Sequence, residues 1–64
     1  MKIEVNGQAH DWAADLASLL EQMGLSDAHV ATALNGVFVP AQRRETTTLK
    51  AGDRVEVLAP MQGG

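Results

Sequence analysis

Hydrophobic and polar residues alternate in two short stretches near opposite ends of the chain. Ile3 and Val5 alternate with charged residues, and residues 53–58 repeat the pattern with Val55 and Val57. A period of two is typical of a strand that buries one face. We therefore expect a strand in each stretch, with these four side chains in the core.

Between them lies a segment with the period of a helix. Its apolar positions have the spacing i, i+3, i+4 and i+7 and are taken by Leu16, Leu19, Leu20 and Met23. Asp15 can cap the first turn, and Gly24 follows where a left-handed residue commonly ends a helix. The pattern predicts a helix over residues 16–23, too short to be stable alone. Its leucine stripe must therefore pack against a sheet.

Two Asn-Gly pairs, at residues 6–7 and 35–36, predict tight hairpin turns. The first leads into a strand over residues 8–12. The second joins strands over residues 30–34, which adds Leu34 to the core, and residues 37–39. Pro40 should end that strand, because it cannot donate to a ladder. Residues 41–48 are polar without a clean period, and we expect a loop with room for one helical turn.

These elements predict the α+β class, with a mixed sheet of four to five strands and one main helix packed across one face. Such a two-layer arrangement suits a chain of 64 residues, which is long enough for one domain and one modest core. We expect the domain to cover residues 1–58. Residues 59–64 fit no regular element and should form a flexible C-terminal tail.

Composition removes several classes of function. Without cysteine, the chain has no disulfide, no thiolate metal site and no nucleophilic thiol. A net charge of −3 and the lack of a basic block argue against nucleic-acid binding. No apolar run approaches the ~20 residues that span a bilayer. The first residues are unlike a secretory signal, so we expect a cytoplasmic protein.

Few side chains are candidates for chemistry. His10 and His29 have no ligand-spaced partner, so we expect neither a metal site nor acid–base catalysis from them. The serines lack a nucleophile elbow, and the glycines are too scattered for a phosphate loop. Trp12 should fill the core or cover the end of the helix. The side chains give no support for an enzyme.

The candidate chemistry lies at the end of the chain, in Gly63 and Gly64. Glycine has no Cβ, so such a tail, with Met61 and Gln62 before it, can thread a narrow cleft. The terminal carboxylate is ionised at neutral pH and is a ready nucleophile toward an activated phosphate. Beside the tail, Leu58 should face away from the helix. Leu58, Pro60, Met61 and a neighbour on the sheet are expected to form an apolar patch where a partner docks.

Several motifs together resemble the ThiS family of sulfur carriers in thiamine-thiazole biosynthesis. They are residues 1–7, Leu19-Leu20-Glu21, Ala33-Leu34-Asn35-Gly36, Val39-Pro40, residues 49–53 and the closing Gln62-Gly63-Gly64. The resemblance covers the whole chain. It implies the ubiquitin-like β-grasp fold, in which the last strand lies beside the first at the centre of the sheet.

The resemblance also implies a mechanism. A ThiF-type adenylating enzyme would use ATP to convert the Gly64 carboxylate to an acyl-adenylate. Sulfur from a cysteine desulfurase relay would displace AMP and leave a thiocarboxylate, which a ThiG-type thiazole synthase would accept. The protein would then be a co-substrate without a bound cofactor, and we expect it to be a monomer when free.

Two related functions remain open at this point. The small subunit of molybdopterin synthase also ends in diglycine, but it is usually longer and has a Pro-Pro pair where this chain has the single Pro60. A ubiquitin-like modifier would share the activation step and then be conjugated to lysines through Gly64. One position departs from the family pattern: Ala41 stands where a basic residue often follows Val-Pro.

Overall fold

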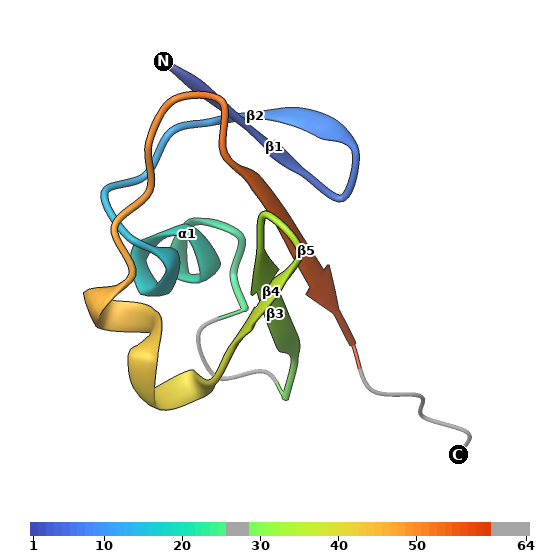
Figure 1. The fold of residues 1–64 in the computed structure, drawn as a ribbon, viewed down its shortest axis with the longest axis vertical. Coiled ribbons are helices and arrows are strands. Elements are labelled where there is room, and N and C mark those ends of the chain that lie inside the picture. The colour runs from blue at the N-terminus through green and yellow to red at the C-terminus, as the bar shows by residue number, and fades with distance from the viewer. Residues whose placement is uncertain (26–28, 60–64) are drawn as a thin grey trace.

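The computed structural model describes residues 1–25 and 29–59. Pro60, Met61, Gln62, Gly63 and Gly64, which carry most of the predicted tail chemistry, lie outside the described residues. Along the chain the elements are β1 (Lys2–Val5), β2 (Gln8–Asp11), α1 (Leu16–Gln22), β3 (Ala31–Leu34), β4 (Val37–Val39), the 3-10 helix η1 (Ala41–Thr46) and β5 (Arg54–Leu58). Figure 1 shows α1 and η1 together on one side of the strands.

The strands form one five-stranded sheet in the order β2-β1-β5-β3-β4. β1 and β5 pair in parallel, with Val5 opposite Val55, whereas β2, β3 and β4 pair antiparallel with their neighbours. The first and last strands are thus neighbours at the centre of the sheet. This confirms the predicted mixed sheet with one main helix and the strand order that the resemblance implies.

The core lies between α1 and the inner face of the sheet, which we define as the face that carries Ile3 and Val57. Its buried apolar members are Ile3, Val5, Ala13, Leu16, Leu19, Leu20, Val39, Leu49, Val55 and Val57. Met23 and Leu34 were predicted to be core residues; both pack against this cluster, but their side chains are only half-buried. Met23 caps the end of α1, and Leu34 adjoins a turn, so each sits at the margin of the core.

The caps and turns follow the sequence closely. The Asp15 side chain accepts a hydrogen bond of 2.7 Å from the Ser18 N–H and so caps α1 as predicted. Asn6 and Asn35 both have positive φ, near 52° and 51°, as the first central residue of a tight Asn-Gly hairpin turn requires. The polar segment after Pro40 holds a 3-10 helix of six residues, longer than the single turn expected. Within residues 1–25 and 29–59, the structure holds no helix of the length and apolarity needed to cross a membrane.

Candidate functional site

β5 leads to the predicted tail, and the turn between β1 and β2 holds the C-terminal end of β5. β1 stops at Val5, whereas β5 continues to Leu58. The Asn6 side chain reaches across from the turn: its Nδ2 donates to the Val57 carbonyl oxygen at 3.1 Å, and its Oδ1 accepts from the Val57 N–H at 2.9 Å. A side-chain amide therefore takes the place of the missing strand residues beside Val57.

The turn between β3 and β4 holds the N-terminal end of β5 in a similar way. The Asn35 Oδ1 accepts from the Arg54 N–H at 2.9 Å, and the Asn35 N–H donates to the Arg54 carbonyl oxygen at 2.7 Å. The Asn35 Nδ2 also donates to a carboxylate oxygen of Asp53 at 3.2 Å. Two asparagines from two hairpins thus fix the two ends of the same strand.

The outer face of the sheet, opposite α1, carries an apolar patch at the end of β5. Leu58 is 63% exposed and lies opposite Ala31, while Phe38 is 66% exposed and lies opposite Ala33. Opposite residues of an antiparallel pair share a face, so these four side chains form one surface, which we call the outer patch. The two alanines of β3 make a low strip between two large apolar side chains. The sheet neighbours expected beside Leu58 are therefore Phe38, Ala31 and Ala33.

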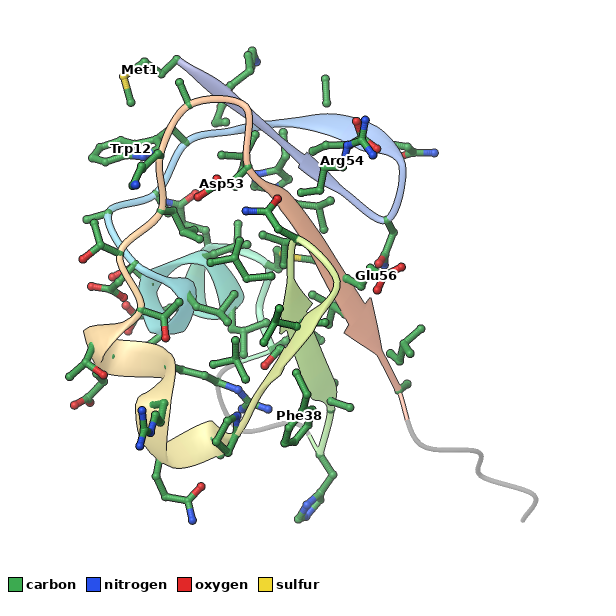
Figure 2. The ribbon with its side chains drawn as sticks, viewed as in Figure 1. Met1, Trp12, Phe38, Asp53, Arg54 and Glu56 are labelled. Atoms are coloured by element: carbon green, nitrogen blue, oxygen red, sulfur yellow. The ribbon has the colours of Figure 1, made fainter. Side chains whose placement is uncertain are left out.

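Charged side chains also lie on the outer face. In Figure 2, Arg54 and Glu56 project from β5 on the side away from α1. Glu4 lies opposite Arg54 in the register of β1 and β5. The outer patch is therefore bordered by charges of both signs, an arrangement common at the rim of a docking surface.

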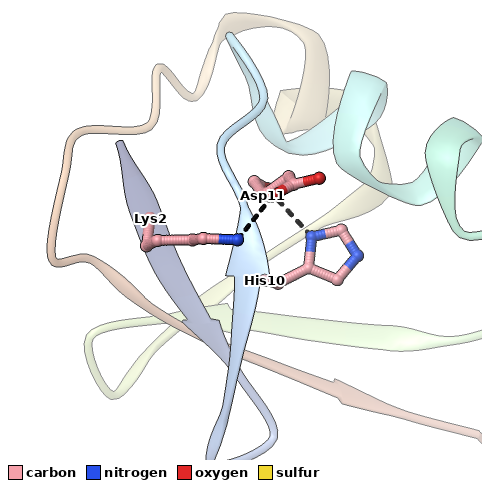
Figure 3. A network of polar contacts seen from close by, with 3 residues as sticks. All are labelled: Lys2, His10 and Asp11. Atoms are coloured by element: carbon pink, nitrogen blue, oxygen red, sulfur yellow. Dashed lines mark hydrogen bonds and ion pairs between the residues drawn. The ribbon is translucent and has the colours of Figure 1, made fainter.

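An ion pair lies on the outer face, at the opposite end of the sheet from Leu58 (Figure 3). The Lys2 Nζ lies 2.6 Å from a carboxylate oxygen of Asp11. The hydrogen bond from Lys2, and then its positive charge, lower the pKa of Asp11 below the ordinary value of 3.8. The His10 Nδ1 lies 2.9 Å from the Asp11 carbonyl oxygen, which can only accept, so Nδ1 carries the proton. His10 is thus engaged in a structural contact.

Two other candidates have structural surroundings. Trp12 is 38% exposed, and its Nε1 donates to the Leu49 carbonyl oxygen at 2.9 Å, so it ties the segment before α1 to the segment before β5. It is not core filler, because its ring remains partly in solvent. Among residues 1–25 and 29–59, no three histidine and carboxylate side chains gather as a metal site would require.

Sequence reasoning found part of this site. Leu58 lies on the outer face, as predicted. Phe38 was missed, although alternation along residues 37–39 puts its side chain on the face of the strand that Val39, which is buried, does not occupy. Asn6 and Asn35 were interpreted only as turn residues, because nothing in the sequence indicates that their side chains reach β5.

Comparisons with known proteins agree with the geometry. The sequence matches the model of the ThiS family over residues 3–64. The structure is similar to the crystal structure of a thiamine biosynthesis protein (ThiS) from Geobacter metallireducens, with a TM-score of 0.83, 33% identity and full coverage of both chains. It is also similar to an NMR structure of a thiamine biosynthesis protein from the same organism, with a TM-score of 0.78, 30% identity and coverage of 100% of this chain and 88% of that one. A comparison with curated proteins found no match.

Proposed function

Because the chain belongs to the ThiS family, of ubiquitin-like β-grasp fold, we propose that it carries sulfur on its C-terminal carboxylate for thiazole formation in thiamine biosynthesis. The observation that carries the proposal is the extent of the family match, which runs through Gln62, Gly63 and Gly64. The protein acts as a co-substrate, and separate enzymes catalyse the reactions.

The chemistry requires activation, because a carboxylate oxygen is a poor leaving group. The Gly64 carboxylate attacks the α-phosphorus of ATP on a ThiF-type adenylating enzyme, and pyrophosphate leaves. Sulfide, whether free or released when a thiol reduces the persulfide of a cysteine desulfurase relay, then attacks the acyl carbon, and AMP leaves. The product is a thiocarboxylate at Gly64, from which a ThiG-type thiazole synthase takes the sulfur. ATP is bound by the activating enzyme, so the carrier itself needs no cofactor.

The position of β5 supports this role. A carrier end must be presented from a firm base, and β5 has a strand on each side at the centre of the sheet. In Figure 1 its arrowhead points away from α1 and η1. Leu58, the last residue of β5, is exposed, so an enzyme can approach this end of the strand.

The outer patch supports docking of the activating enzyme. Exposed Leu58 and Phe38 supply the large apolar side chains that form the centre of many interfaces, and the charges around them supply a polar rim. A partner seated there lies beside the root of the tail. Pro60 and Met61, which were predicted from the sequence to join the docking patch, follow Leu58 by two and three positions and lie outside the described residues.

The test is to charge the purified protein. It is incubated with a ThiF-type enzyme, ATP and sulfide, and its intact mass is measured. We expect a product heavier by the exchange of one oxygen for sulfur, with the change mapped to Gly64 by fragmentation. A protein that lacks Gly64 serves as the control and should keep its fold, because residues 1–59 already contain all the described elements.

Three outcomes separate the candidates. An uncharged full-length protein, or equal charging of the shortened one, contradicts the proposal. Conjugates to lysine side chains, found in tryptic digests of extracts as a branched remnant of residues 55–64 because Arg54 is the last tryptic site, favour the protein modifier. Transfer of sulfur to a molybdopterin precursor in place of thiazole synthase favours the molybdopterin carrier. The cytoplasmic location stays a prediction.

A further inference from the structure

We propose that Asn6 is a positioning residue. Its side-chain amide holds Val57, near the C-terminal end of β5, and thereby restrains the root of the tail, Leu58 and Ala59, while the Gly64 carboxylate is activated. The inference rests on the proposed function, because it concerns how the Gly64 carboxylate is delivered to the activating enzyme. Asn6 lies on a different element from the tail and acts through Val57.

The geometry shows a ladder that changes from main chain to side chain. The Glu4 N–H donates to the Asp53 carbonyl oxygen, and the Asn6 N–H donates to the Val55 carbonyl oxygen, each at 2.9 Å. The next backbone pair on this edge of β5 belongs to Val57. There β1 has already turned into the hairpin, and the Asn6 amide supplies both the acceptor and the donor.

This contact matters because β5 has strands of unequal length on its two sides. On one side β3 pairs with it as far as Leu58. On the other side the strand pairing with β1 includes Val55, and beyond it Asn6 binds Val57. Unpaired backbone groups at the end of a strand favour local opening. Asn6 therefore extends two-sided pairing to within two residues of Ala59.

Ordering of this kind raises the rate of a reaction more than it raises docking affinity. The outer patch binds the partner whether or not the tail root is firmly held. The probability that the carboxylate lies in line with the α-phosphorus rises when the orientation of the root of the tail is restricted. Loss of the amide is therefore expected to lower kcat for charging while KM stays close to its original value.

Asn35 provides a matched control within the same molecule. Both asparagines precede a glycine in a hairpin turn, both have positive φ, and each side chain makes two hydrogen bonds. Both bind β5, but Asn35 binds Arg54, at the end distant from the tail. Glycine adopts positive φ without strain, so Asn6→Gly and Asn35→Gly remove the side-chain bonds and keep the turns.

The experiment compares charging by the ThiF-type enzyme, ATP and sulfide for the original protein, Asn6→Gly and Asn35→Gly, below their melting temperatures. We expect Asn6→Gly to lower kcat about tenfold, the size expected when a pair of ordering hydrogen bonds is lost, with KM changed less than about twofold. Asn35→Gly should leave both constants near those of the original protein. Amide hydrogen exchange at Val57 should accelerate only in Asn6→Gly.

A conservative variant sharpens the result. Asn6→Asp keeps the acceptor for the Val57 N–H and loses the donor to the Val57 carbonyl, so its kcat should lie between those of Asn6→Gly and the original protein. Equal charging of Asn6→Gly and Asn35→Gly overturns the role of Asn6, and so does a change confined to KM. If the original protein is not charged, the proposed function itself fails, and exchange at Val57 still reports whether Asn6 holds the strand.

Discussion

The two faces of the sheet are built from the same strands yet have opposite properties. On the inner face, α1 covers residues such as Val55 and Val57, which are almost inaccessible to solvent. On the outer face, the alternate residues Arg54, Glu56 and Leu58 are exposed. Because neighbouring side chains of a strand point to opposite faces, one short segment supplies side chains both to the core and to the outer patch that we propose for docking. Substitutions on the two faces should therefore have separable effects.

The largest effect is expected from a leucine on the inner side. Leu20→Ala, like Leu19→Ala, removes a buried side chain and leaves a cavity in the core. It should therefore lower the free energy of unfolding by about 2–5 kcal/mol. That is a large share of the stability of a small domain. Chemical denaturation measures it. The same substitution at Leu58, on the outer face, is the control and should cost far less; equal losses would mean that the faces do not differ.

A smaller loss is expected from the one buried polar side chain of the inner face among the described residues. Thr32 is 1% exposed; its Oγ1 donates to the Val39 carbonyl oxygen and accepts from the Arg44 Nε at 3.1 Å. Thr32→Val leaves that Nε without its acceptor and should cost about 1–3 kcal/mol by chemical denaturation. Thr46→Val, which removes an exposed hydroxyl, is the control. A neutral Thr32→Val would show that Arg44 finds another partner.

On β4 the comparison can be made with two adjacent residues of nearly equal exposure. Phe38 (66%) belongs to the outer patch, whereas Val37 (67%) lies opposite Leu34 and faces the other side. Phe38→Ala should raise KM for the activating enzyme by about fivefold or more, as loss of an interface anchor does, with little change in stability. Val37→Ala should change KM little. If both variants raise KM alike, the outer patch is not the docking surface.

The smallest effect concerns the ion pair of the outer face. The folded-state pKa of Asp11 is depressed by Lys2, so the pair contributes stability above the ordinary pKa of 3.8, and this contribution is lost as the pH falls through the folded-state value. Both side chains are largely exposed, so the contribution is small and salt weakens it. Asp11→Asn should flatten this part of the pH profile of stability in low salt. Glu45→Gln is the control, and an unchanged profile in Asp11→Asn would contradict the assignment.

Much of the fold was predictable because its signals are local. The Leu16, Leu19 and Leu20 stripe, the Asp15 cap and the two Asn-Gly turns each depend on residues close in sequence. The buried positions of Ala13 and Leu49 were missed, because both lie in irregular segments where no period marks an inner side. Their burial follows from contacts between distant parts of the chain, and the sequence alone does not state these.

The site was predictable only where it follows a strand pattern, the chemistry of the chain end or a resemblance. Leu58 follows from alternation along β5. The terminal glycines were singled out because they lack a Cβ and end in a carboxylate, whereas the sulfur chemistry came from the resemblance. Gly63 and Gly64 lie outside the part of the chain that the structure describes. The amide of Asn6 was not foreseen, because a turn residue binding a strand about fifty positions later leaves no local signal.

The parallel pair of β1 and β5 has a consequence for how the protein is made. During translation β1 emerges first and β5 last among the described strands, so the middle of the sheet stays vacant until β5 has left the ribosome. An incomplete chain lacks Leu58 as well as its central strand. The hairpin of β1 and β2 and the hairpin of β3 and β4 are therefore joined into one sheet only when β5 is in place.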